Sequence, residues 1–173
     1  VKQHSGYIGV ETELGKGATF CIYLPAHEME LLEGAVVPSA TPPPGNGESI
    51  LLVEDEERVR EALREILETL GYKVLAARNG QEALSLYESA QTVDLVLTDV
   101  VMPGISGLEL IRQIRGIPAL QELPVIATSA SVFAEDRDQS LAVGGDAFVP
   151  KPIAVDDLLT HLERLLDLKW IYD

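Results

Sequence analysis

Short apolar runs alternate with longer amphipathic segments along residues 49–168, and this alternation constrains the fold more than any other feature of the chain. Short, almost purely apolar runs are typical of strands that are buried on both faces of a parallel sheet. The segments between them carry apolar residues at helical spacing. Five strands that alternate with five helices predict an α/β domain: a doubly wound, five-stranded parallel sheet with helices on both faces.

Turn and capping signals mark where the elements begin and end. Gly71 follows the first helical segment as a stop signal. Asn79 with Glu82, and Ser106 with Glu109, match the spacing of a capping box at a helix start. The predicted strands are 49–54, 73–77, 94–98, 124–129 and 146–149, and the predicted helices are 57–70, 80–90, 106–116, 133–143 and 154–168. The side chains expected to face the core from the first and last helices are Val59, Leu63, Ile66 and Leu70, and Leu158, Leu162 and Leu165.

The charge of the chain excludes several classes of partner. The 173 residues carry a formal net charge of −15, which argues against binding to nucleic-acid phosphates or to an anionic membrane surface. A single cysteine, Cys21, allows no internal disulfide. No apolar run reaches the roughly 18 residues of a membrane span, and no signal-peptide pattern opens the chain. We therefore expect a cytoplasmic setting, with no nucleic acid and no membrane contact by this segment.

The composition divides the chain into parts. Residues 1–25 contain alternating apolar and polar residues on both sides of a Gly-Lys-Gly turn, which predicts a β-hairpin over 6–25. Residues 26–48 include consecutive prolines followed by glycines and are expected to form a linker. The α/β domain then covers 49–168, and 169–173 form a short tail.

Polar residues stand where the predicted strands end. Glu54 and Asp55 close the first strand, Asp99 follows the third, Ser129 ends the fourth, and Lys151 comes just after the fifth. In a parallel α/β sheet the reactive crevice lies beyond the carboxyl ends of the strands. We therefore expect these five side chains to converge on one edge of the sheet.

Such a group of residues suits phosphoryl chemistry. Three neighbouring carboxylates repel one another, and one would be driven to protonate unless a cation intervened. Mg²⁺ prefers hard oxygen ligands and keeps several waters, so a shallow acidic site fits it. Asp99 is then a candidate nucleophile that forms an acyl phosphate, with Lys151 and Ser129 holding the phosphoryl oxygens.

Each of these residues also has a simpler interpretation. Asp99 alone is equally consistent with a helix cap, and the Glu-Asp-Glu-Glu run with a solvated acidic turn. Ser129 is consistent with an ordinary strand-end hydroxyl and Lys151 with a surface lysine. It is improbable that all of these simpler interpretations hold at once, because the five residues stand at the ends of four different predicted strands.

Four stretches carry a resemblance to a known family: ILLVEDEE, LVLTDVVMPGISG, PVIATSA and FVPKP. With their order and spacing, they resemble the receiver domain of response regulators in two-component signalling, over nearly all of 49–168. The resemblance implies the flavodoxin-like strand order 2-1-3-4-5. It also implies a phosphoacceptor that takes its phosphoryl group from a kinase histidine and requires Mg²⁺.

The resemblance assigns a role to each site residue. Asp99 falls on the phosphoacceptor, and the Mg²⁺ ligands fall on Asp55, Asp99 and the backbone carbonyl of Val101. Glu54 replaces the aspartate that is frequent in the family, and its longer arm is expected to reach the metal through water. Three further assignments are the phosphate-binding and switch residues Ser129 and Lys151, the switch aromatic Phe148, and a cis peptide bond before Pro152.

The predicted hairpin resembles the end of a histidine-kinase ATP-binding domain. The asparagine motif, the DxGxG motif and the glycine-rich lid of that domain are absent from this sequence, and a lone GKG is no P-loop. We therefore expect neither ATP binding nor kinase activity from this chain alone. His4, His27 and His161 are expected to be ordinary surface residues.

Together the two resemblances imply the C-terminal receiver of a hybrid sensor histidine kinase. The implied partners are the kinase core, in cis or in trans, and a histidine phosphotransfer protein.

Two other functions fit part of the pattern. An aspartate-nucleophile phosphohydrolase of the haloacid-dehalogenase type also places an aspartate at a strand end, but it needs a second one two residues later as general acid. Here that position is Val101. A pure interaction module with an inactive site is the third possibility, and the complete set of acids, hydroxyl and lysine argues against it.

Overall fold

The computed structural model describes residues 7–13, 15, 17–23, 45–89, 92–130 and 134–167. The chain divides into two units, Val1–Ser39 and Ala40–Asp173. The predicted linker up to residue 44, the tail, and the histidines at 4 and 27 lie outside the described residues. None of the described helices combines the length and the apolar character needed to cross a bilayer.

The first unit contains the predicted β-hairpin. Strand β1 (Tyr7–Glu13) pairs antiparallel with β2 (Gly17–Tyr23). Val10 lies opposite Phe20, and both side chains are largely exposed, at 53% and 65%. Gly15 has a φ of +82°, a left-handed conformation that glycine adopts without strain, and this explains why a glycine occupies the turn.

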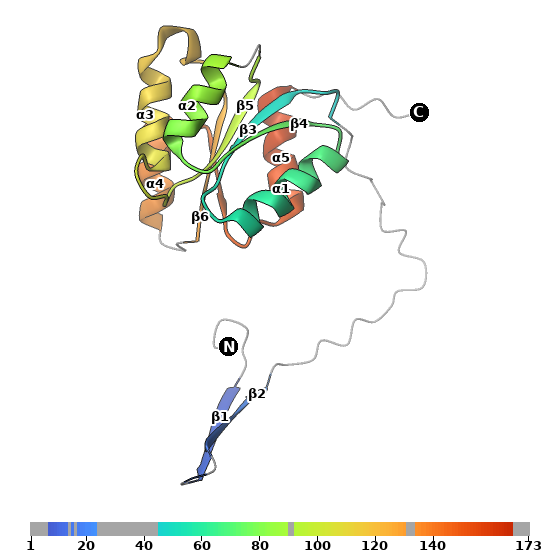
Figure 1. Ribbon diagram of the computed structural model, residues 1–173, viewed down its shortest axis with the longest axis vertical. Helices are drawn as coiled ribbons and strands as arrows, with labels where there is room; N and C mark the ends of the chain where they lie inside the picture. The colour runs from blue at the N-terminus through green and yellow to red at the C-terminus, as the bar shows by residue number, and fades with distance from the viewer. Residues whose placement is uncertain are drawn as a thin grey trace. The chain divides into compact units, whose positions relative to one another are not determined.

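The second unit is built on a five-stranded parallel sheet of order β4-β3-β5-β6-β7, shown in Figure 1. Its strands are β3 (Ser49–Val53), β4 (Lys73–Ala77), β5 (Leu95–Asp99), β6 (Val125–Ser129) and β7 (Ala147–Pro150). This is the 2-1-3-4-5 order, so the predicted fold class is confirmed. The central strands β5 and β6 are buried along their whole length, which explains why their sequences, LVLTD and VIATS, are mostly apolar.

Helices cover both faces of the sheet. Helices α1 and α5 lie on one face, and α2, α3 and α4 lie on the other (Figure 1). Their bounds are α1 (Glu57–Thr69), α2 (Gly80–Ser89), α3 (Gly107–Gly116), α4 (Ala134–Ala142) and α5 (Val155–Leu166), with an additional short 3-10 helix, η2 (Pro118–Leu120). The sequence patterns predicted the five α-helices and missed η2, because three residues carry no periodicity.

Both predicted helix starts are capped by the expected side chain. The Asn79 Oδ1 atom accepts a hydrogen bond from the Glu82 amide at 2.9 Å, and the Glu82 carboxylate accepts one from the Arg78 amide. Ser106 Oγ accepts from the Glu109 amide at 3.3 Å. The Glu109 carboxylate does not return the bond, because it binds side chains further along α3. The second capping box is therefore only half formed.

The buried stripe of α1 differs from the predicted one at a single position, since Val59 and Leu70 pack against the core cluster as expected. Leu63 is buried as expected, but the second fully buried side chain is Leu67, and Ile66 is only half-buried. Leu63 and Leu67 are four residues apart and therefore lie on the same face of the helix. The core-facing residues of α5 agree with the prediction. Leu158 and Leu162 are buried in the core cluster between the sheet and helices α1 and α5, and Leu165 packs against it.

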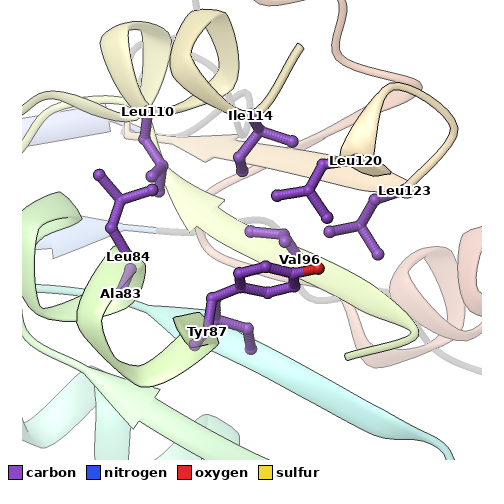
Figure 2. A pocket seen from close by; sticks show the side chains of 9 residues that line it. Ala83, Leu84, Tyr87, Val96, Leu110, Ile114, Leu120 and Leu123 are labelled. Atoms are coloured by element: carbon purple, nitrogen blue, oxygen red, sulfur yellow. The ribbon is translucent and has the colours of Figure 1, made fainter. Parts of the chain in front are cut away.

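A small apolar cavity lies between the sheet and helices α2 and α3, and Figure 2 shows its lining. The lining residues are Leu51, Ala83, Leu84, Tyr87, Val96, Leu110, Ile114, Leu120 and Leu123. The Tyr87 hydroxyl is the only polar side-chain atom in this set. A cavity with one polar group cannot orient a charged ligand, so we regard it as a packing defect of the core.

Candidate functional site

The described acidic residues that cluster most closely lie at the carboxyl end of the sheet. Glu54 and Asp55 directly follow β3, and Asp99 is the last residue of β5. One carboxylate oxygen from each lies within 4.8 Å of the others. Glu54 is only 1% exposed and Asp99 7% exposed, whereas Asp55 faces solvent. The cluster is therefore enclosed by protein at Glu54 and Asp99 and open to solvent at Asp55. A small cation that keeps some water ligands would fit it.

Lys151 joins the cluster from the end of β7. Its Nζ atom donates to Glu54 Oε2 and to Asp99 Oδ2, each at 2.7 Å. Burial alone would lower the pKa of the Lys151 ammonium, but these hydrogen bonds raise it above its ordinary value. Burial raises the pKa of Glu54, and the Lys151 ammonium partly opposes that shift. When all four groups are ionised, two negative charges remain, which match a divalent cation.

Arg60, a residue that the sequence analysis did not single out, holds the loop that carries the acidic pair. Its Nη1 atom donates to the backbone carbonyls of Glu54, at 2.8 Å, and Asp55, at 3.2 Å. Arg60 lies in the first turns of α1 and reaches back over the strand end. An arginine early in a helix is common, and its contact with backbone atoms leaves no sequence signal.

The backbone after Asp99 turns sharply beside the site. The Val101 amide donates to Asp99 Oδ1 at 3.2 Å, and the Val101 side chain is 66% exposed. The chain then returns so that the Gly107 amide bonds the Val100 carbonyl at 3.1 Å. A Cβ atom at Gly107 would collide with the carbonyl of Asp99, so only glycine fits there.

Ser129 is fully buried at the end of β6, and its hydroxyl is bonded to α4. Its Oγ donates to Asp136 Oδ2 at 2.8 Å. Its backbone carbonyl accepts from the Lys151 amide, also at 2.8 Å. Ser129 therefore lies at the expected edge of the sheet, but its hydroxyl donates to Asp136, a residue that the sequence did not single out. An aspartate seven positions after a serine is too common a pattern to reveal this hydrogen bond.

The structure also places the other residues that the sequence singled out. Phe148 is half-buried in β7 and packs against the core cluster beneath α2 and α3. The Lys151–Pro152 peptide bond is cis. His161 lies in α5, away from the cluster, and is half-buried rather than exposed; burial lowers its pKa.

The fold and the site define a doubly wound α/β domain with an acidic site and a lysine at the carboxyl edge of its sheet. The model of the response regulator receiver domain family matches residues 50–163. The chain belongs to this family, and it is a receiver domain of two-component signalling.

Two kinds of curated relative match the chain. It is 41% identical over 117 residues to the response regulator MprA of Mycobacterium tuberculosis, an alignment that covers 68% of this chain and 50% of the relative. It is 34% identical over 177 residues to the sensor kinase CckA of Brucella abortus, covering 96% of this chain and 18% of the kinase. The chain thus spans about half the length of the response regulators it matches and under a fifth of CckA.

Solved receiver domains of kinases have the same fold. The receiver domain of a signal transduction histidine kinase from Syntrophus aciditrophicus is 36% identical with a TM-score of 0.64, covering 73% of this chain and 98% of its own. The receiver domain of a sensor histidine kinase from Pseudomonas aeruginosa is 30% identical with a TM-score of 0.65, covering 70% and 99%. The latter structure holds a magnesium ion in its active-site cleft.

Proposed function

We propose that this receiver domain accepts a phosphoryl group from a kinase histidine onto Asp99, with Mg²⁺, and changes conformation in response. The observation that carries the proposal is the pair of 2.7 Å hydrogen bonds from Lys151 to Glu54 and Asp99, in an acidic cluster that also includes Asp55. A lysine fixed on the nucleophile can neutralise the charge of an incoming phosphoryl group without reorganising.

The proposed metal ligands are Asp55, Asp99 and the Val101 carbonyl, with Glu54 acting through a water molecule. Three carboxylate oxygens within 4.8 Å are the hard donors that Mg²⁺ prefers, so the residues present fit this ion. When bound, Mg²⁺ would neutralise charge on the transferred phosphoryl group. Arg60 would keep the carbonyls of the acidic pair turned away from the metal, because it already binds them.

In the proposed transfer, an Asp99 carboxylate oxygen attacks the phosphorus of the phosphohistidine. A P–O bond forms, the P–N bond breaks, and the imidazole nitrogen keeps the electron pair. The Lys151 ammonium then donates its hydrogen bond to a phosphoryl oxygen instead of the Asp99 carboxylate, because the negative charge now lies on the phosphoryl group. The Ser129 hydroxyl donates to another phosphoryl oxygen, and Phe148 fills the space that the Ser129 side chain leaves.

The function is tested by labelling the chain with radioactive acetyl phosphate, with and without Mg²⁺. We expect a Mg²⁺-dependent label that hydroxylamine removes, as for an acyl phosphate, and no release of phosphate from added phosphoesters. Sustained phosphoester turnover would support the phosphohydrolase instead. A chain that takes up no label under any condition would be an interaction module with an inactive site.

The two acids after β3 should contribute unequally to metal binding. Asp55→Ala should weaken Mg²⁺ binding by more than Glu54→Ala, because the exposed Asp55 is the direct ligand and the Glu54 carboxylate is occupied by Lys151. A Mg²⁺ titration followed by amide chemical shifts would measure both variants. Glu88→Ala, which removes an exposed carboxylate from the end of α2, controls for net charge. Equal losses for both acids would indicate direct ligation by Glu54.

The alignment to CckA along 96% of the chain supports a proposal for its origin. We propose that it is part of a hybrid sensor histidine kinase: residues 1–25 end the ATP-binding domain, 26–48 are a linker, 49–168 the receiver and 169–173 a tail. The kinase core would donate the phosphoryl group, and a histidine phosphotransfer protein would receive it. Because the ATP-binding motifs are absent from this segment, the segment alone would have no kinase activity.

A further inference from the structure

The hydroxyl of Ser129 has two competing acceptors in the proposed cycle. In the structure it donates to Asp136 Oδ2 at 2.8 Å. In the phosphorylated domain it would donate to a phosphoryl oxygen on Asp99. A serine hydroxyl has a single proton to donate, so it cannot serve both acceptors at once.

We propose that Asp136 is a positioning residue that holds the Ser129 hydroxyl on α4 in the unphosphorylated domain. The inference rests on the proposed function, since it concerns the step in which Ser129 turns to the phosphoryl group. The Asp136 carboxylate opposes that step and so sets how readily the domain enters its phosphorylated conformation. Asp136 is not part of the acidic cluster, and in this role it would act only through Ser129.

Burial and charge make this hydrogen bond an effective restraint. Ser129 is 0% exposed, so its hydroxyl cannot exchange Asp136 for bulk water when the bond breaks. The acceptor is a carboxylate, and hydrogen bonds to charged acceptors are stronger than those between neutral groups. A phosphoryl group that brings nearly two negative charges can still outcompete a single carboxylate. The equilibrium between the two conformations is therefore biased, and phosphorylation can reverse it.

The positions of the two residues show which parts of the domain the bond connects. Asp136 lies in the first turn of α4, and Ser129 ends β6. The Ser129 carbonyl is bonded to the Lys151 amide, so the backbone is anchored and the side chain alone has to rotate. When the Ser129 side chain rotates, its hydrogen bond to the Asp136 carboxylate breaks. The first turn of α4 then loses its link to the end of β6. Helix α4 is thus the element that would respond first to phosphorylation of Asp99.

Beryllofluoride, which mimics a phosphoryl group on a carboxylate, provides the test on the full chain with saturating Mg²⁺. The affinity of beryllofluoride depends on the fraction of domains in the competent conformation. Asp136→Ala removes the acceptor and should bind about tenfold more tightly than the wild type, about 1.4 kcal/mol. Asp136→Asn keeps a neutral acceptor oxygen, so its affinity for beryllofluoride should lie between those of the wild type and Asp136→Ala.

Two controls separate the hydrogen bond from a general effect of charge. Asp138→Ala removes an exposed carboxylate from the same helix and should change the affinity by less than about twofold, roughly 0.4 kcal/mol. In a double-mutant cycle, Asp136→Ala should lose its effect when Ser129 is already alanine. The proposal is wrong if Asp136→Ala behaves like Asp138→Ala, or if its effect persists without the Ser129 hydroxyl.

A measurement without beryllofluoride keeps this inference distinct from the proposed function. The χ1 rotamer of Ser129, from three-bond couplings to its β protons, should be single in the wild type and averaged in Asp136→Ala. A single, unchanged rotamer in that variant would contradict the restraint even if beryllofluoride binds normally. If instead the wild type binds no beryllofluoride, the proposed function fails, and the proposed role of Asp136 fails with it.

Discussion

Asp99→Asn is expected to abolish both the acetyl phosphate label and the response to beryllofluoride while leaving the fold intact. The substitution removes the nucleophilic carboxylate at almost constant volume. The asparagine oxygen can still accept the hydrogen bond from the Val101 amide, and Lys151 keeps Glu54 as its ionic partner. Stability should stay the same or rise slightly, because one of three neighbouring carboxylates is neutralised.

Incorporated label and urea unfolding together measure this result. Asp94→Asn is a matched control, since Asp94 precedes the same strand and its carboxylate accepts a hydrogen bond from the Ser49 amide, at the opposite edge of the sheet. That variant should be labelled like the wild type. Label retained at wild-type stoichiometry on Asp99→Asn would move the phosphoacceptor to another residue.

Gly107→Ala should be among the most destabilising single substitutions in the domain. A Cβ atom at this position would overlap the Asp99 carbonyl and come within 2.9 Å of the Val100 Cα. Both are backbone atoms at the end of the central strand β5, so neither can move as a flexible side chain would. Overpacking of this kind typically costs about 1–3 kcal/mol, and we expect at least about 2 kcal/mol from urea unfolding.

Gly116→Ala is the matched control, because nothing lies within 4 Å of a Cβ atom at that end of α3. It should be neutral or stabilise the domain by up to about 1 kcal/mol, since alanine favours helix. An equal loss of stability in the two variants would show that alanine is harmful in α3 for reasons other than the contact with Asp99. Gly107→Ala should also weaken Mg²⁺ binding. The added Cβ atom would displace the backbone after Asp99, and this backbone carries the Val101 carbonyl, a proposed metal ligand.

Much of the fold was predictable because it depends on local patterns. Apolar runs and helical spacing located all five strands and all five α-helices of the second unit to within a few residues, and Asn79 marked the start of α2. Periodicity alone did not supply the strand order, because five similar apolar strands can be arranged in several ways. The order came from the family resemblance, and the parallel pairings confirm it.

The meeting of Glu54, Asp55, Asp99 and Lys151 was also predictable, since the carboxyl ends of parallel strands share one edge. The sequence by itself therefore determined the fold class, the place of the site and its acidic and basic groups. Only the tertiary structure decided the partners of individual side chains: Arg60 on two backbone carbonyls, Leu67 rather than Ile66 in the core, and Ser129 on Asp136. The physical reason is that a strand end fixes where a residue lies, whereas its side-chain direction depends on which donors and acceptors the packed helices bring within reach.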